Sequence, residues 1–211
     1  MDINLWSSDE HSREYLQRAD SIPHRREGEA VLLEFLPERM ERFLDVGSGA
    51  GRLLSLVKSV RPAAQSVALD FSATMLNRLR QQTDANTLVV EHDLSKPLPE
   101  LGSFDAIVSS FAIHHVSHHR KHTLYAEIFA RLNPGGVFLN LEHVSSHTAN
   151  LHAQFLAAMG TTPETEDPSN KLLDLNTQLI WLREIGFVDV DCHWKWRELA
   201  LLAGVKPASV A

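Results

Sequence analysis

The stretch that most constrains the fold is "FLDVGSGAGRLL", residues 43–54. An apolar run ends in an acid, Asp45, and glycines follow at every second position, Gly47, Gly49 and Gly51. A strand that turns at once into a helix presents free backbone N–H groups and the positive end of the helix dipole. Glycines permit such a tight turn and remove side chains that would keep a ligand away. The stretch therefore predicts a strand, a ligand-binding turn and a helix.

The rest of the chain repeats this alternation of short apolar runs with helical patterns. Strands are predicted at 42–46, 66–70, 87–91, 104–110 and 136–144, with helices at 51–60, 72–82 and 119–132 between them. Strands that alternate with helices indicate parallel βαβ units. The sequence thus predicts an α/β fold with a doubly wound sheet.

The two ends depart from the alternation. Helical spacing predicts helices at 8–20 and 24–36 before the glycine stretch, and 147–172 reads as an insertion made of a helix and the loop "TTPETEDPSNK". After a helix at 175–186, strand patterns at 187–196 and 198–206 follow each other directly, which indicates an antiparallel pair. Alternation within the first of them predicts that one face carries Val188, Val190, Cys192, Trp194 and Trp196.

Composition narrows the classes of function. The net charge of −7 works against binding to a phosphate backbone, so no nucleic-acid partner is expected. The single cysteine, Cys192, excludes an internal disulfide and a multi-cysteine zinc site. The first residues lack a secretory pattern and no apolar run reaches about 18 residues, so no membrane partner and a cytoplasmic location are expected.

The glycine spacing separates this turn from two common phosphate-binding motifs. The glycines are spaced G-x-G-x-G, with Arg52 at the place of the last glycine of a dinucleotide fingerprint. The Gly-Lys-Ser/Thr ending of a nucleoside triphosphate loop is also missing, since Gly51 is followed by Arg52 and Leu53.

From about residue 41 to about residue 203 the chain resembles the class I S-adenosylmethionine-dependent methyltransferases. The resemblance rests on "DVGSGAG" at 45–51, "VALD" ending at Asp70, "EHDLS" with Asp93, "FDAIVSSFAIHHV" at 104–116 and "LNPGGVFLNLE" at 132–142. It implies one domain over 1–211 and a seven-stranded Rossmann-like sheet, mostly parallel, with an antiparallel C-terminal strand and helices on both faces. The implied cofactor is S-adenosylmethionine, and its product is S-adenosylhomocysteine.

The resemblance also assigns cofactor contacts. Asp70 would hold both ribose hydroxyls, and Asp93 with the backbone of Leu94 would read the adenine amino group. The alternative for Asp70 is to cap the next helix, for which Ser72 is an equally good residue, and the alternative for Asp93 is an ordinary turn. Asp45 either fixes the glycine turn or binds the cofactor's ammonium group. The expected cofactor-binding residues are Asp45, Gly47, Ser48, Gly49, Gly51, Asp70, Phe71, Asp93, Leu94, Ser109 and Ser110.

Methyl transfer from a sulfonium mainly requires a positioned nucleophile and, for a hydroxyl or ammonium, a base. Candidate catalytic residues are His114 and His115 after the fourth strand and His143 at the end of the fifth. On a helix, His115, His118 or His119, and His122 would share a face suited to zinc. Because a histidine pair after the fourth strand occurs widely in the resembled family without metal, no metal is expected.

Candidate substrate-contacting residues are Trp6, Tyr15, Arg25 and Glu142, with residues 1–40 as an N-terminal helical lid and 147–172 as an insertion over the site. The leading expectation is methyl transfer to an oxygen or nitrogen of a small molecule by a monomer or homodimer. The rivals are a synthase of carboxy-S-adenosylmethionine, a methyltransferase acting on RNA or protein, and a non-catalytic regulator that binds the cofactor.

Overall fold

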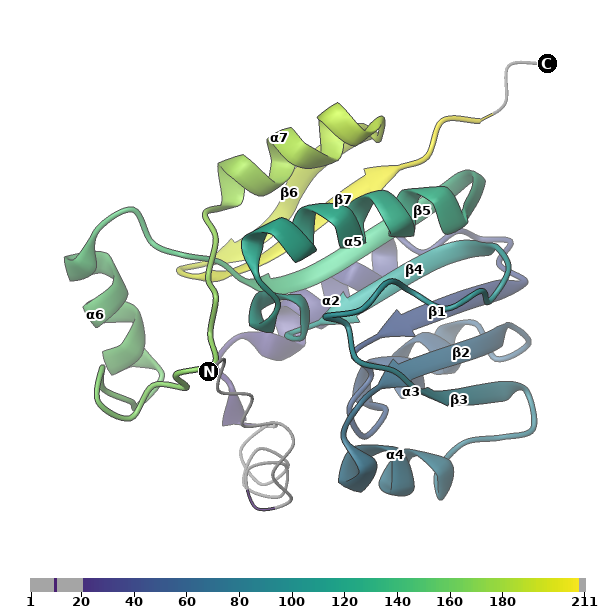
Figure 1. The fold of residues 1–211 in the computed structure, drawn as a ribbon, viewed down its shortest axis with the longest axis horizontal. Helices are drawn as coiled ribbons and strands as arrows, with labels where there is room; N and C mark the ends of the chain where they lie inside the picture. Colours follow the sequence, from purple (N-terminus) through teal and green to yellow (C-terminus); the bar gives the residue numbers. More distant parts are fainter. Residues whose placement is uncertain (1–9, 11–20, 209–211) are drawn as a thin grey trace.

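The computed structural model describes residue 10 and residues 21–208. Its centre is one seven-stranded sheet with the strand order β3-β2-β1-β4-β5-β7-β6 (Figure 1). The strands are β1 Arg42–Val46, β2 Gln65–Asp70, β3 Thr87–Glu91, β4 Phe104–Ser110, β5 Leu132–His143, β6 Val188–Trp196 and β7 Leu199–Val205. β7 pairs antiparallel with both of its neighbours, and the other pairs are parallel. The predicted fold class is confirmed.

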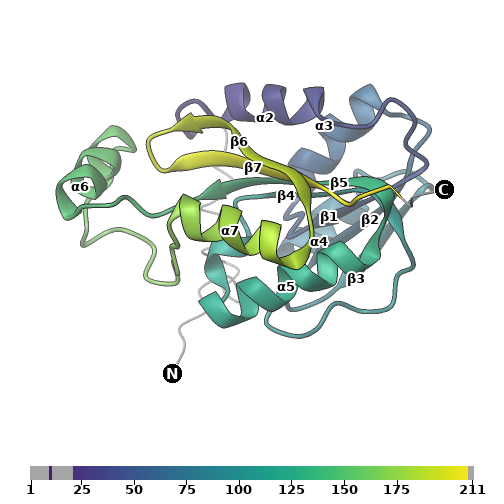
Figure 2. The same cartoon turned by 90° about the horizontal axis from the view of Figure 1, so that it is seen from above.

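Helices cover both faces of the sheet (Figure 2). They are α2 Arg25–Glu34, α3 Arg52–Val60, α4 Ala73–Arg80, α5 His118–Arg131, α6 Ala149–Ala158 and α7 Leu175–Ile185, with a 3-10 turn η3 at Ile113–His115. α2 and α3 lie on one face and α5 and α7 on the other, while α6 lies beyond the end of β5. Phe155 and Leu156 of α6 pack there on Leu199 of β7. Within the described residues, no helix is long and apolar enough to cross a bilayer.

Two apolar cores separate the layers, because successive side chains of a strand point to opposite faces. In β1, Phe43 packs into the cluster that contains Leu32 of α2, and Leu44 packs into the cluster that contains Leu124 of α5. Both faces are buried, so the central strands read as continuous apolar runs instead of alternating ones. This burial is why the strand patterns were visible in the sequence.

The predicted shared face of Val190, Cys192 and Trp194 is wrong. Cys192 pairs with Leu202 and Trp194 pairs with Leu201, so His193 is an extra residue in β6. Such a bulge turns the following side chains to the other face of the sheet. Val190 and Cys192 pack with the α5 and α7 cluster, whereas Trp194 packs with the α2 and α3 cluster.

The described part of the expected N-terminal lid forms a layer of the fold. α2 packs against α3, β5, β6 and β7, and a Cβ on Gly28 would lie 2.8 Å from both Leu141 and the Trp194 ring. Only a glycine lets α2 approach the sheet this closely. The residues just before it, Ile22 and Pro23, line a cavity described below.

The strand order places a binding crevice at a definite point. Connections from β1 and β4 lead to opposite sides, because β2 and β3 lie beyond β1 while β5 lies beyond β4. Ligands of open α/β sheets bind at the carboxyl ends of the strands at this reversal. The glycine turn after β1 and the histidines after β4 both lie there.

Candidate functional site

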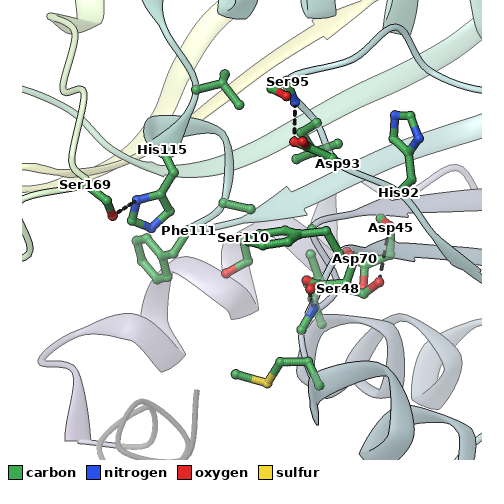
Figure 3. Close-up of a pocket in the computed structure, with 18 of the residues that line it drawn as sticks. Asp45, Ser48, Asp70, His92, Asp93, Ser95, Ser110, Phe111, His115 and Ser169 are labelled. Carbon is green, nitrogen blue, oxygen red and sulfur yellow. Dashed lines mark hydrogen bonds between the residues drawn. The ribbon is translucent and has the colours of Figure 1, made fainter. Parts of the chain in front are cut away.

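A cavity of about 360 Å³ opens at the carboxyl ends of β1 to β4 (Figure 3), and we call it the turn cavity. The residues on its wall follow four different strands, so the sheet itself positions them. Of the expected cofactor residues it is lined by Asp45, Gly47, Ser48, Gly49, Asp70, Phe71, Asp93, Leu94 and Ser110. Gly51 and Ser109 do not line it: Gly51 caps α3, and the Ser109 hydroxyl donates to the carbonyl of Val46 at 2.8 Å.

Two glycines of the turn, Gly47 and Gly49, both have positive φ but differ in what surrounds them. Gly47 has φ 71°, and a Cβ there would lie 2.2 Å from the Cβ of Ala112. Gly49 has φ 54°, but a Cβ there would meet nothing within 4 Å. Gly47 is therefore required by the neighbouring loop, whereas Gly49 leaves open space in the turn cavity. This is the shape expected of a turn that a ligand approaches closely.

Asp45 is fully buried, and neither of its carboxylate oxygens accepts a hydrogen bond from the described residues. Burial raises the pKa of Asp45 to about 8, and the nearby Asp70 raises it too. The backbone N–H of Leu54, which does not reach hydrogen-bond geometry, opposes them. An orphaned buried acid is costly unless a ligand supplies its partner. Of the two roles left open from the sequence, the geometry favours a ligand ammonium over fixing of the turn.

Asp70 joins two turns. One oxygen accepts the N–H of Gly49 at 2.8 Å, and the other accepts the N–H of Ser72 at 2.9 Å. Burial raises the pKa of Asp70, and these amides oppose the rise. The helix cap of α4 is Ser72 itself, whose hydroxyl accepts from Met75. Each carboxylate oxygen has a further lone pair, so Asp70 can also accept ligand hydroxyls.

The loop after β3 supplies the far end of the turn cavity. Asp93 accepts the N–H of Ser95 at 2.8 Å, as in an ordinary Asx turn, and both Asp93 and Leu94 line the cavity. Two buried polar atoms there make no hydrogen bond with the described residues, His92 Nε2 and Ser110 Oγ. His92 was missed from the sequence, although its place beside Asp93 was a usable signal.

A second cavity of about 460 Å³ adjoins the turn cavity, and we call it the histidine cavity. The two share Phe111 and His115 as lining residues. His114 and His143 also line it, together with side chains from α6 and the loop behind α6. The three expected catalytic histidines are thus brought together. The centroid of the His114 ring lies 4.0 Å from that of His115 and 5.5 Å from that of His143.

Two of these histidines each bond to a buried glutamate. His114 Nδ1 lies 2.7 Å from Glu142 Oε1, and His143 Nε2 lies 3.0 Å from Glu198 Oε2. Burial lowers the pKa of His114 well below its usual value, with His143 and Lys121 adding to the effect. Glu142 is 0% exposed and lines neither cavity, so direct substrate contact by Glu142, expected from the sequence, is not supported.

The third histidine, His115, is held by the loop that follows α6. Its Nδ1 lies 3.0 Å from the hydroxyl of Ser169, and burial lowers its pKa to about 2. Lys171 attaches the same loop to η3, because its N–H donates to the carbonyl of His114 at 2.8 Å. The end of the 147–172 insertion therefore forms part of the wall between the two cavities.

α6 is attached to the sheet by an ionisable network that the sequence analysis missed. His152 of α6 lies 3.0 Å from Glu198 Oε1 through Nδ1 and 3.1 Å from Glu166 Oε2 through Nε2. Burial opposes ionisation of His152, but Glu198 and Glu166 raise its pKa overall. Glu198 lies between β6 and β7, so only the folded sheet brings it beside His143 and His152.

The remaining expected residues have different positions. Arg25 lines the turn cavity, donates to Glu29 at 2.8 Å and stacks over Phe111. Trp6 and Tyr15 lie outside the described residues. The histidines considered for zinc diverge, since His118 bonds to the carbonyl of Leu172 and His122 packs on Trp181. Among residues that the structure describes, no group of three potential metal ligands is present.

Comparison with known proteins agrees with this geometry. Residues 43–136 match the family model described as a methyltransferase domain. A demethylmenaquinone methyltransferase of Thermus thermophilus is 34% identical over 56% of this chain and 53% of its own length. A carboxy-S-adenosyl-L-methionine synthase of Helicobacter hepaticus is 21% identical over 88% of this chain and 87% of its own.

The first of these relatives is matched over only about half of its length. Among solved structures, human N-acetylserotonin methyltransferase in complex with S-adenosylmethionine superimposes with a TM-score of 0.71 at 19% identity, over 97% of this chain and 58% of that one. Residues 43–136, which contain the glycine turn, therefore match a methyltransferase domain, and the chain has the fold of S-adenosylmethionine-dependent methyltransferases.

Proposed function

We propose that this protein transfers a methyl group from S-adenosylmethionine to an oxygen or nitrogen atom of a small molecule bound in the histidine cavity. The observation that carries the proposal is that two cavities meet at Phe111 and His115, one lined by the glycine turn and one by His114 and His143. A transfer reaction needs two sites that share a wall. The turn cavity would hold the cofactor, and the histidine cavity would hold the acceptor.

The residues of the turn cavity fit the cofactor. Asp45 would bind its ammonium group, Asp70 its ribose hydroxyls, and Asp93 with the backbone of Leu94 its adenine amino group. The unpaired oxygens of Asp45 and the open space at Gly49 support this assignment, because a ligand would satisfy the first and occupy the second. Bound S-adenosylmethionine supplies a methyl group on a positively charged sulfur, which is already a good leaving group.

The histidine cavity supplies a base. Burial keeps His114 neutral at pH 7, and its bond to Glu142 uses Nδ1, which leaves Nε2 to take a proton from a hydroxyl or an ammonium group. His143 bonds to Glu198 through Nε2 instead, which leaves its Nδ1 as the nitrogen for proton transfer. A carboxylate that holds one ring nitrogen orients the imidazole and supports the positive charge that proton transfer creates.

The character of the histidine cavity supports a small acceptor. Its volume of about 460 Å³ lies within the usual range of small-molecule pockets. Its lining combines apolar side chains of α6, Phe155 and Leu156, with Glu166 and Asn170 of the following loop. The net charge of −7 gives no support to a nucleic-acid acceptor.

Carboxy-S-adenosylmethionine synthesis is the second candidate, because relatives with that name match most of the chain. That reaction needs a cation for a second carboxylate. The described residues that line the histidine cavity include no lysine or arginine. The cations of the turn cavity already have partners: Arg25 and Arg52 pair with Glu29, Arg120 pairs with Glu127, and Lys171 Nζ donates to the carbonyl of His115. Methyl transfer is therefore the leading proposal.

The test is transfer of labelled methyl from S-adenosylmethionine into a cell extract that is separated into small-molecule, RNA and protein fractions. Label in small molecules, lost in His114→Gln and kept in His119→Gln, would support the proposal. His119 is a matched control because it is an exposed histidine that lines neither cavity. Label in RNA or protein, or no label from protein that binds S-adenosylhomocysteine tightly, would contradict it.

A further inference from the structure

Arg120, on the first turn of α5, lies on the wall of the turn cavity and is only 9% exposed. All five N–H donors of its guanidinium group have an acceptor. Nε donates to the carbonyl of Leu94 at 2.7 Å, and Nη2 donates to the carbonyl of Lys96 at 2.8 Å. The other three donate to the hydroxyl of Thr123 and to the carboxylate of Glu127. Methyl transfer as described so far gives this arginine no role.

Glu127, also on α5, holds the guanidinium group of Arg120 in one orientation. Its Oε1 lies 2.7 Å from Nη1 and its Oε2 lies 2.9 Å from Nη2. Two parallel bonds of this kind fix the plane of the guanidinium group as well as its place. Glu127 also accepts the N–H of Leu98 at 2.8 Å. Burial raises the pKa of Glu127, but the bonds from Arg120 and Leu98 lower it overall. The pair therefore attaches the loop after β3 to α5.

The peptide group between Leu94 and Ser95 connects Arg120 with Asp93. Its carbonyl accepts from Arg120 Nε at 2.7 Å, and its N–H donates to Asp93 Oδ1 at 2.8 Å (Figure 3). A peptide group is planar, so a bond that holds the carbonyl also fixes the direction of the N–H. That N–H holds the carboxylate of Asp93, a residue that lines the turn cavity. Arg120 thus acts on the Asp93 carboxylate through one peptide plane.

We propose that Arg120 is a positioning residue for the cofactor's base: it holds this peptide plane and thereby directs the Asp93 carboxylate to the adenine amino group. The inference rests on the proposed function, which assigns that contact to Asp93. An ionised carboxylate only accepts hydrogen bonds. It therefore favours adenine, which presents an amino group, over hypoxanthine, which presents a carbonyl oxygen at the same place.

The experiment measures the affinities of S-adenosylhomocysteine and S-inosylhomocysteine by calorimetry, and the readout is the ratio of the two. We expect the wild type to prefer S-adenosylhomocysteine at least about tenfold, because an oxygen that faces the Asp93 carboxylate offers it no donor. Arg120→Lys keeps the charge but has three donors and no planar fork. Its preference should fall to less than about threefold, since the peptide plane is no longer held.

Arg131→Lys is the matched control. Arg131 ends the same helix and donates to the same loop, but at the carbonyls of Leu98 and Pro99 and at the carboxylate of Glu100. It lines neither cavity. Its preference for S-adenosylhomocysteine should match the wild type. An equal loss of preference in the two arginine variants would overturn the proposal, because any loosening of the loop would then have the same effect.

A double substitution tests whether Arg120 acts through Asp93. Asp93→Ala should lose the preference, and Arg120→Lys added to it should change the ratio no further. A further change in the double variant would overturn the proposal, as would a folded Arg120→Lys protein with the wild-type ratio. Should Arg120→Lys fail to fold, Glu127→Gln takes its place, because it removes the charged partner of the guanidinium group. An unchanged ratio in Glu127→Gln would then overturn the proposal.

Failure of the proposed function gives a different result. If Asp93→Ala keeps the wild-type preference, the adenine contact assigned to Asp93 is wrong and the role of Arg120 is overturned with it. If the wild type binds neither ligand, the turn cavity does not hold the cofactor and both proposals are overturned. A preference that is lost in Asp93→Ala but kept in Arg120→Lys contradicts only the role of Arg120.

Discussion

The carboxyl groups of Asp45 and Asp70 lie at the same end of two paired parallel strands, and Asp70 raises the pKa of Asp45. Their surroundings differ: Asp70 accepts two backbone amides, whereas the oxygens of Asp45 accept no hydrogen bond from the described residues. Two acids at one site therefore have separate tasks. Asp70 shapes the turn, and a cationic ligand is the partner that we propose for Asp45.

We predict that cofactor binding releases a proton from Asp45. With a pKa of about 8, Asp45 is mostly protonated at pH 7 in the free protein, and an ammonium ligand favours the carboxylate. Calorimetry with S-adenosylhomocysteine at pH 7, in buffers of different ionisation enthalpy, should show release of nearly one proton. Asp45→Asn should abolish most of this release and weaken binding by about 1 to 3 kcal/mol. Equal proton release in the two proteins would contradict the assignment.

The same carboxyl should make the free protein less stable at high pH. A folded-state pKa raised from 3.8 to about 8 means that stability from the protonated form is fully present below about pH 4 and is lost as pH rises toward 8. Compared with Asp45→Asn, the wild-type melting temperature should therefore fall between pH 5 and pH 8. Parallel melting curves for the two proteins over that range would show that Asp45 has no raised pKa.

Asp70→Ala should weaken binding of S-adenosylhomocysteine by about 1 to 3 kcal/mol, since it removes an acceptor for the ribose hydroxyls and for two backbone amides. Asp84→Ala is the control, because Asp84 is an exposed acid that caps a turn through the N–H of Asn86. Calorimetry should find unchanged affinity for this control. Unchanged affinity for Asp70→Ala would remove Asp70 from the site.

Alanine at two glycines should separate folding from binding. Gly47→Ala places a Cβ 2.2 Å from Ala112, so the loop must move and the melting temperature should fall strongly. Gly49→Ala has open space and should cost only the roughly 1 to 2 kcal/mol of left-handed backbone, while its methyl group obstructs the ligand. Melting curves and calorimetry should thus rank the two variants in opposite order. The same order in both measurements would contradict the view that Gly49 faces the ligand.

The attachment of α6 should depend on pH through His152. Its raised pKa means that the bonds to Glu198 and Glu166 contribute stability fully below about pH 6.5, and that this contribution is lost as pH rises through the folded-state value. Hydrogen exchange of the α6 amides, corrected for intrinsic rates, should be faster at pH 8 than at pH 6. His152→Gln should remove that difference, and a difference that persists would assign it to another group.

Much of the fold was predictable because it depends on local patterns. Buried parallel strands appear as short apolar runs, and the glycine turn is recognisable because its glycines lie at every second position. The sheet and the wall of the turn cavity were therefore expected. The bulge at His193 was not, since nothing in "FVDVDCHWKW" distinguishes an extra residue from a regular one. The face on which Trp194 lies was therefore predicted wrongly.

The histidine cavity was only partly predictable. His114, His115 and His143 follow strands whose ends meet, and they were expected together. Their partners come from distant segments: Ser169 from the loop after α6, and Glu198 from the turn before β7. Lys121, which is buried on α5, belongs to a histidine-rich run that resembles an exposed helix start. Pairings of this kind depend on how the layers pack, which periodicity does not encode.

The contact of Gly28 with Trp194 has a consequence for folding kinetics. It joins a helix near the start of the described chain to a strand near its end, and the sheet order also places β7 between β5 and β6. Pairings between residues so distant in sequence carry a large loop-closure entropy and form slowly. During synthesis, α2 can therefore complete its packing on the sheet only after β6 and β7 have left the ribosome. We expect refolding to be limited by this late closure and to be slowed further by any enlargement of the side chain at Gly28.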